Sequence, residues 1–188
     1  MNKPSVFVAV MDAVRPDHLS CYGYLRKTTP NIDKIAQEGA LFENAFSTAP
    51  CTLPSHASMF TGMYPSQHGC VHHNMDGENF YLHEAIPTIG EIFGSKGYAT
   101  LGICENPWVS SQTGLDRGFK KFVSRLSRGY IERFSRRLSL NWIIFCLETD
   151  IRFIVYNWGS QARVFQEIKK CILTAQKRNK PFFIFINY

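Results

Sequence analysis

The chain has 188 residues, with 21 Lys and Arg against 15 Asp and Glu, a formal net charge of +6 and 45% hydrophobic residues. This length and composition predict one globular domain with a sizeable core, and they exclude a disordered, collagen-like or disulfide-dominated chain. The six cysteines form no C-x-x-C pair, so neither a zinc ribbon nor a small disulfide scaffold is indicated.

The N-terminus lacks the pattern of a secretory signal, because only eight residues separate Lys3 from Asp12 and no small-residue cleavage site follows them. An apolar stretch over 142–156 is a poor membrane span, because it contains Glu148, Asp150 and Arg152. The sequence therefore predicts a cytoplasmic protein.

The predicted elements begin with a strand. Val6 to Met11 is a continuous apolar run, typical of a strand buried on both faces of a parallel sheet, and it ends at Asp12. A capping threonine before Pro30, followed by apolar residues at helical spacing, predicts a short helix that stops at Gly39. Residues 40–47 alternate between apolar and polar side chains, which predicts a half-buried strand.

Helices and strands continue to alternate along the rest of the chain. Helices are predicted over 54–60, 87–95 and 160–177, and strands over 98–104 and 181–188. This alternation predicts an α/β fold, in which functional groups gather beyond the carboxyl ends of the strands. No polar tail follows the last strand, so we expect the chain to be a fragment of a longer protein.

Thr52 stands at the start of the helix predicted from Pro54. Proline suits the first helical position, which would put the Thr52 hydroxyl at the positive end of that helix. A phosphate or sulfate could rest there while the hydroxyl attacks it. An ordinary helix-capping threonine is the alternative from local sequence alone.

Short motifs then follow one another in a fixed order over most of residues 5 to 119. They comprise Asp12, Cys21-Tyr22-Gly23, Thr29-Pro30-Asn31-Ile32-Asp33, Glu38-Gly39, Thr52-Leu53-Pro54-Ser55, Thr61-Gly62, Pro65, His68-Gly69, Gly97-Tyr98-Ala99-Thr100 and Gly118-Phe119. Together they resemble the N-terminal half of the sulfatase branch of the alkaline phosphatase superfamily. The resemblance implies an alkaline phosphatase-like, mostly parallel sheet flanked by helices and incomplete at the C-terminus. Residues 1–188 would be the N-terminal portion of the catalytic domain, with a basic insertion at about 117–140.

The nucleophile of that family lies two residues before the proline of the motif, which is Thr52 in this chain. Cys51 is out of register by one residue, so formylglycine chemistry is not supported, and we expect Cys51 to be a small buried turn residue. The resemblance thus implies a metal-dependent hydrolase or transferase that acts on sulfate or phosphate esters through Thr52. Contact with a metal would lower the pKa of this hydroxyl.

Asp12 resembles the first metal-binding aspartate of the family, and Thr52 would be both nucleophile and metal ligand. The implied cofactor is a divalent ion, with Mn, Zn, Ca and Mg all open. Many sulfatases have a second aspartate directly after the first, but this chain has Ala13 there, which leaves the number of metal ions open. From the residue alone, a turn or helix-capping aspartate is an equal alternative for Asp12.

His56 stands where sulfatases usually carry arginine, one helical turn after Thr52. We expect it to bind an anionic oxygen or to assist proton transfer, with a hydrogen-bonded structural histidine as the equal alternative. Asn106 is a weaker candidate as a donor to substrate, because a turn asparagine before proline needs no function. The histidines at 68, 72 and 73 match no helical metal motif and could all be exposed loop residues, so metal binding there is not favoured.

Basic residues concentrate in one segment, where eight Lys and Arg face only Glu132 between positions 117 and 137 and give a charge of +7. With its interleaved apolar residues, this segment could bind an anionic membrane surface or attract an anionic ester substrate, whereas nucleic acid is a less favoured partner. A solvated helical face is the simpler interpretation. The alternative function is therefore an inactive or truncated homologue that binds anionic lipid or nucleic acid through this segment.

Overall fold

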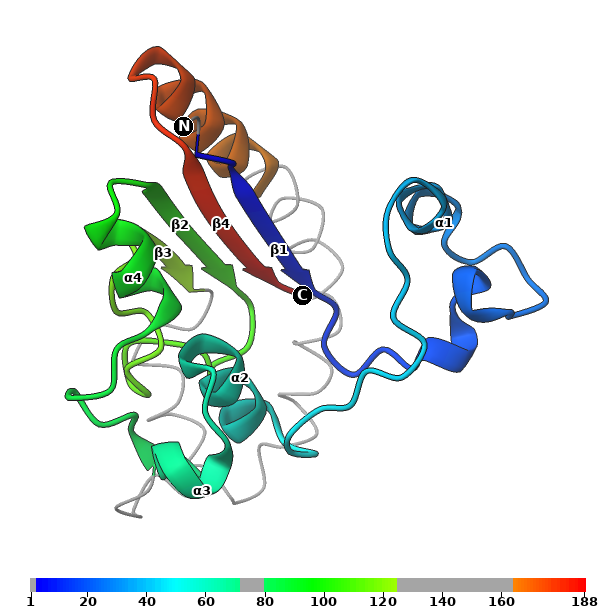
Figure 1. The fold of residues 1–188 in the computed structure, drawn as a ribbon, viewed down its shortest axis with the longest axis horizontal. Helices are drawn as coiled ribbons and strands as arrows, with labels where there is room; N and C mark the ends of the chain where they lie inside the picture. Colours follow the sequence, from blue (N-terminus) through cyan, green and yellow to red (C-terminus); the bar gives the residue numbers. More distant parts are fainter. Residues whose placement is uncertain (1–2, 72–79, 125–163) are drawn as a thin grey trace, which may run out of the picture.

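The structure is a computed structural model, and it describes residues 3–71, 80–124 and 164–188. These residues form one parallel four-stranded sheet in the order β1-β4-β2-β3, shown in Figure 1. The strands are β1 (Val6–Val10), β2 (Ala99–Cys104), β3 (Lys121–Ser124) and β4 (Phe182–Asn187). All three pairings are parallel, which confirms the predicted α/β class. The carboxyl ends of all the described strands therefore lie at the same edge of the sheet.

Helices cover both faces of the sheet. In chain order the labelled helices are η1 (Pro16–His18), η2 (Ser20–Tyr22), α1 (Pro30–Glu38), α2 (Thr52–Thr61), α3 (Pro65–His68) and α4 (Ile89–Ser95). A further helix spans 164–177 and is orange in Figure 1. Residues of α2 and α4 share one apolar cluster with the sheet, and residues of the helix over 164–177 share the other. The described part of the chain is therefore a three-layer arrangement.

The central strand β4 supplies both clusters because its side chains alternate between the faces. Phe183 and Phe185 are buried with the residues of α2 and α4, while Ile184 and Ile186 are buried against the helix over 164–177. The Phe60 ring of α2 meets Phe185 edge to face, with 4.8 Å between ring centroids. Each fully buried side chain of this size contributes about 1.5–3 kcal/mol, so these contacts fix α2 against the sheet.

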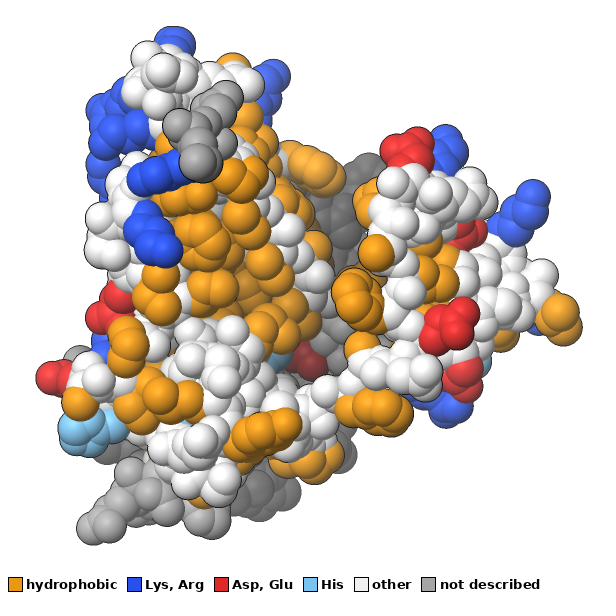
Figure 2. All heavy atoms as spheres, in the orientation of Figure 1, with side chains coloured by type: hydrophobic (Ala, Val, Ile, Leu, Met, Phe, Trp, Pro, Cys, Tyr) orange, Lys and Arg blue, Asp and Glu red, His pale blue; other side chains and the backbone are white. Residues whose placement is uncertain are grey.

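The segment with η1, η2 and α1 projects from the sheet, and hydrophobic side chains lie open over the sheet in Figure 2. A set of hydrogen bonds holds this segment together, in which the Asp33 carboxylate accepts from Ser20 Oγ at 2.7 Å and from Thr29 Oγ1 at 3.1 Å. The Thr29 hydroxyl therefore binds the Asp33 side chain instead of capping a backbone N–H of α1. This contact gives a structural reason for the Thr29 to Asp33 motif.

Two strand predictions need correction. β1 is buried on one face only, since Val6, Val8 and Val10 pack in the core while Phe7 remains 50% exposed. Residues 40–47 form no strand, because no described strand pairs with them, and their apolar side chains Leu41, Phe42 and Phe46 are exposed. The other predicted elements match to within about two residues at each end, apart from the start of the helix over 160–177, which lies outside the described residues, whereas η1, η2, α3 and β3 were not predicted.

No helix among the described residues is long and apolar enough to cross a bilayer. The apolar stretch over 142–156 lies outside the described residues.

Gly118 provides a test of the packing between α4 and the sheet. Its φ is +80°, and a Cβ there would lie 2.0 Å from the backbone nitrogen of Glu91. We expect Gly118→Ala to lower the free energy of unfolding by about 3 kcal/mol or more, because backbone strain and overpacking add.

Gly97 is the matched control, with a similar φ of +84° and no atom within 4 Å of the added Cβ. Gly97→Ala should cost only the left-handed strain of about 1–2 kcal/mol. Urea unfolding of both variants measures the difference, and equal losses would show that close packing at Gly118 is unimportant.

Candidate functional site

Polar residues meet at the carboxyl edge of the sheet. The ladder between β1 and β4 continues past the strands, as Tyr188 donates its N–H to the Val10 carbonyl at 2.9 Å and Asp12 donates its N–H to the Tyr188 carbonyl at 2.7 Å. Asp12 thus stands at the end of β1, as predicted, with its side chain partly exposed. Asn187 ends β4, and Asn106 follows β2 by two residues.

The N-terminus of α2 points to this edge. The helix begins at Thr52, two residues earlier than predicted, and Cys51 occupies the capping position without a side-chain hydrogen bond. Pro54 is the third helical residue, where its missing N–H is not needed. The first turn therefore leaves the N–H groups of Thr52 and Leu53 without intrahelical partners. Cys51 is exposed, so the expectation that it is a buried turn residue is wrong.

The side-chain amide of Asn106 joins the two predicted metal ligands. Its Nδ2 donates to Asp12 Oδ2 at 2.8 Å and lies 3.3 Å from Thr52 Oγ1. Its Oδ1 accepts the backbone N–H of Trp108 at 3.0 Å. Because a backbone N–H only donates, this contact fixes which end of the amide faces Asp12 and Thr52. Three residues far apart in sequence are thereby brought to one point.

His56 is buried, with 3% of its surface exposed. Its Nδ1 lies 2.8 Å from the Thr52 carbonyl oxygen, which only accepts, so Nδ1 carries the proton. Its Nε2 lies 2.9 Å from Asn187 Nδ2 and accepts from that amide. Both ring nitrogens are thus engaged within the protein, an arrangement that fits the structural alternative for His56. Burial lowers the pKa of the ring, partly offset by its contact with Thr52 and by the charge of Asp12.

Asn187 was not identified from sequence. It is 1% exposed, and its Oδ1 has no hydrogen-bond partner among the described residues. A polar residue at the end of an otherwise apolar strand was the available signal, because such strand ends face the functional crevice of an α/β sheet.

Asp12 and Thr52 suit a hard cation by their chemistry, since each offers oxygen and both contact the same amide nitrogen. Sulfatases generally use a divalent metal. Among the described residues, however, no group of three His, Cys, Asp or Glu side chains is placed to hold an ion. The described part of the chain thus brings Asp12 and Thr52 together only as candidate ligands.

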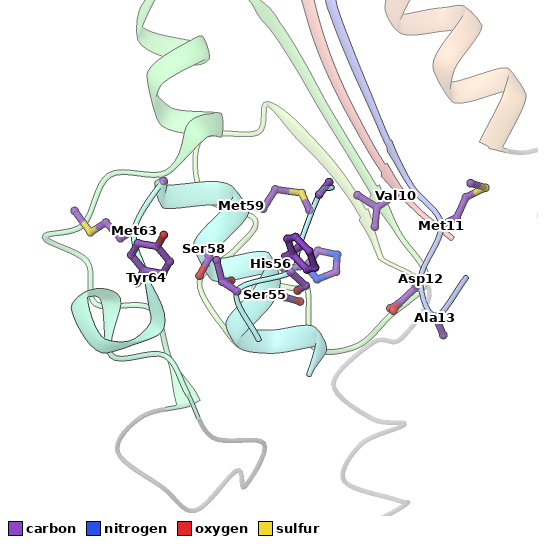
Figure 3. Close-up of a pocket in the computed structure, with 15 residues that line it drawn as sticks. Val10, Met11, Asp12, Ala13, Ser55, His56, Ser58, Met59, Met63 and Tyr64 are labelled. Carbon is purple, nitrogen blue, oxygen red and sulfur yellow. The ribbon is translucent and has the colours of Figure 1, made fainter. Parts of the chain in front are cut away.

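A pocket of about 690 Å³ adjoins the site between the end of β1, residues 45–48 and α2. Figure 3 shows Asp12, Ser55 and His56 along it, together with Met11, Met59 and Met63. None of its lining residues is Lys or Arg. An anion bound beside this pocket would therefore rely on neutral N–H and O–H donors, because the lining residues provide no Lys or Arg side chain.

The other predicted candidates lie elsewhere. His68 is buried in contact with Ser58, so the exposed loop position considered for it is wrong, and His72 and His73 lie outside the described residues. Of the basic segment, Arg117 donates to several backbone carbonyls, including that of Ile86 at 2.8 Å, and Lys121 pairs with Glu167. Lys121 also begins β3, so an insertion could start only after Ser124, and residues 125–163 are outside the described part.

The buried state of His56 makes a testable prediction. We expect ring ¹⁵N NMR of His56 at pH 7 to show the neutral form protonated at Nδ1, with a pKa below the ordinary histidine value. As pH falls through that ordinary value, His56 becomes protonated in the unfolded chain but stays neutral in the folded protein. This difference lowers the free energy of unfolding in acid. A charged ring at pH 7, or the Nε2–H form, would contradict the assigned hydrogen bonds.

Comparisons with known proteins agree on one family. The Sulfatase family model matches residues 4–188. The chain is 30% identical over 119 residues to the Delta 4,5-hexuronate-2-O-sulfatase of Bacteroides thetaiotaomicron, covering 63% of this chain and 24% of that protein. It is 37% identical over 98 residues to an arylsulfatase of Clostridium perfringens, covering 52% of this chain and 20% of that protein.

A solved 2-O GAG sulfatase superposes with a TM-score of 0.55 at 29% identity, covering 67% of this chain and 26% of that structure. The chain thus spans about a quarter or less of the length of these relatives. The matched motifs and the parallel sheet agree with this likeness. The chain belongs to the sulfatase family, within the alkaline phosphatase superfamily.

Proposed function

We propose that the protein is a hydrolase or transferase that acts on sulfate or phosphate esters through Thr52. The observation that carries the proposal is the placement of Thr52 Oγ1 at the N-terminus of α2, 3.3 Å from Asn106 Nδ2, with Asp12 bonded to the same nitrogen. The family relatives are sulfatases, which supports an ester of this kind.

In the first step, Thr52 Oγ forms a bond to the sulfur or phosphorus while the bond to the ester oxygen breaks, and the proton of the Thr52 hydroxyl passes to that oxygen, which leaves as the alcohol. In the second step, water or an acceptor alcohol attacks the same atom and frees Thr52. The N–H groups of Thr52 and Leu53, at the positive end of α2, would bind the anionic oxygens of the transferring group.

Asn106 would hold the Thr52 hydroxyl. Both of its N–H groups are engaged, by Asp12 and Thr52, so donation to the substrate, as predicted from sequence, would require one of these two bonds to be exchanged. A divalent ion (Mn, Zn, Ca or Mg) would be held by Asp12 and Thr52 with ligands from outside the described residues, and it would lower the pKa of the hydroxyl. The substrate is an anionic ester, and the chemistry described applies equally to sulfate and phosphate.

The role of Thr52 is tested by Thr52→Ala. We expect turnover of aryl sulfates and aryl phosphates by the full-length protein to fall by at least about 10⁴-fold, because no other group replaces the nucleophile. Thr52→Ser keeps a hydroxyl and should retain measurable turnover. Each variant is assayed with Mn²⁺, Zn²⁺, Mg²⁺ and Ca²⁺ in turn, and wild-type turnover by Thr52→Ala would refute the proposal.

Cys51→Ala is the matched control from the neighbouring position. Cys51 is exposed at the helix cap and makes no side-chain cap, so its removal should leave kcat within about 3-fold of wild type. A loss of kcat as large as that of Thr52→Ala would indicate that Cys51, and not Thr52, is the nucleophile.

Asn106→Leu tests the bridge to Asp12 and Thr52. The variant removes the donor of both hydrogen bonds and should lower kcat by about 10²-fold, as for other donors in catalytic sites. Steady-state kinetics on the better of the two esters measures the effect. A change in kcat of less than about 3-fold would show that Thr52 needs no contact with Asn106.

A further inference from the structure

The backbone carbonyl of Thr52 accepts two side-chain hydrogen bonds from the following turn. Ser55 Oγ donates to it at 3.0 Å and His56 Nδ1 at 2.8 Å. In an ordinary helix this carbonyl would accept only the backbone N–H four residues on. The last two residues of the Thr52-Leu53-Pro54-Ser55-His56 motif therefore bind the backbone of Thr52.

His56 is in turn held from the sheet. Asn187 Nδ2 donates to His56 Nε2 at 2.9 Å, and the ring stands edge-on to Phe185 at 6.2 Å between centroids. Asn187 is itself fixed, because its backbone is in β4 and its carbonyl accepts the N–H of Glu105. Both His56 and Asn187 are at most 3% exposed. A continuous path of hydrogen bonds thus runs from the central strand to the backbone of Thr52.

This path complements the contact made by Asn106. Asn106 reaches the hydroxyl of Thr52, while the path from Asn187 reaches its carbonyl. The apolar contacts of α2 set the position of the helix, but they are not directional. Directional hydrogen bonds to both the side-chain hydroxyl and the backbone carbonyl of Thr52 would fix where the hydroxyl points.

We propose that Asn187 and His56 are positioning residues that fix Thr52 relative to the carboxyl edge of the sheet. The inference rests on the proposed role of Thr52 as the nucleophile. Neither side chain touches the reacting atoms, and both ring nitrogens of His56 are already engaged. Their loss should therefore slow the chemical step without weakening substrate binding.

The test uses Asn187→Leu in the full-length protein, since leucine has the same number and branching of side-chain heavy atoms and cannot donate. We expect kcat on an aryl sulfate or phosphate to fall about 10- to 100-fold, with KM within about 3-fold of wild type. His56→Asn breaks the same bond from the other side, because its amide can replace Nδ1 toward Thr52 but cannot reach Asn187. It should lower kcat similarly, and it carries the test if Asn187→Leu fails to fold.

The double variant Asn187→Leu/His56→Asn should be no slower than the slower single variant, because both changes break one path. Thr88→Val is the control for stability. The Thr88 side chain is fully buried, donates to the Arg117 carbonyl at 2.9 Å and caps α4 by accepting the Glu91 N–H at 3.2 Å, so Thr88→Val loses buried hydrogen bonds away from Thr52. Its kcat should stay within about 3-fold of wild type.

Three results would overturn the inference: a kcat for Asn187→Leu no lower than that of Thr88→Val, multiplicative losses in the double variant, or a raised KM. Loss of one limb of the kcat–pH profile in His56→Asn, but not in Asn187→Leu, would assign proton transfer to His56 instead. Thr52→Ala is run alongside. Turnover that survives this change refutes the proposed function itself, whereas its loss with a normal Asn187→Leu refutes only the positioning role.

Discussion

The common direction of the four strands is the constraint on which the site depends. Because β1, β4 and β2 are parallel neighbours, the residues that end or follow them, Asp12, Asn187 and Asn106, must emerge at one edge. Neighbouring strands lie about 4.8 Å apart, so the ends of β1 and β2 are separated by roughly 10 Å. That gap is too wide for a direct contact between the strand ends, and the Asn106 side chain closes it by reaching back to Asp12.

The helix that carries Thr52 is placed by a different kind of force. Leu53, Ala57 and Phe60 are buried in the cluster between α2 and the sheet, and this burial supplies most of the free energy that holds α2 there. A net hydrogen bond contributes only about 1 kcal/mol, but leaving a buried partner unsatisfied costs about 1–3 kcal/mol. The apolar side chains therefore set where the helix lies, and the hydrogen bonds of the polar side chains around Thr52 fix its exact position within the helix.

The fold was largely predictable because periodicity reports which faces are buried. β2, β4 and the helices had clear patterns, and Asp12 could be assigned to a strand end from the apolar run before it. The segment over 40–47 also alternates, yet it forms no strand, because pairing depends on a neighbour that local sequence does not reveal. β3 was missed for the opposite reason, since its first residue, Lys121, belongs to a run dominated by charge.

The site was less predictable, because its geometry depends on contacts between distant residues. The resemblance singled out Asp12, Thr52 and His56 one at a time, but the bonds of Asn106 to residues 94 and 54 positions away had no local signal. His68 shows the same limit. Its spacing from the other histidines allowed an exposed loop position, whereas the fold buries its ring against Ser58.

The change from arginine to histidine at position 56 has a physical consequence for the whole motif. A guanidinium stays charged at any physiological pH, so burying it beside Phe185 would carry a desolvation cost that only a partner such as the nearby Asp12 carboxylate could offset. A neutral imidazole avoids that cost and uses its two nitrogens in opposite senses, as donor to Thr52 and acceptor from Asn187. His56 and Asn187 are therefore matched to each other. With no Lys or Arg along the adjoining pocket, anion binding under the proposed function would rely on the N–H groups at the start of α2 and on hydroxyl groups of the lining Ser, Thr and Tyr residues.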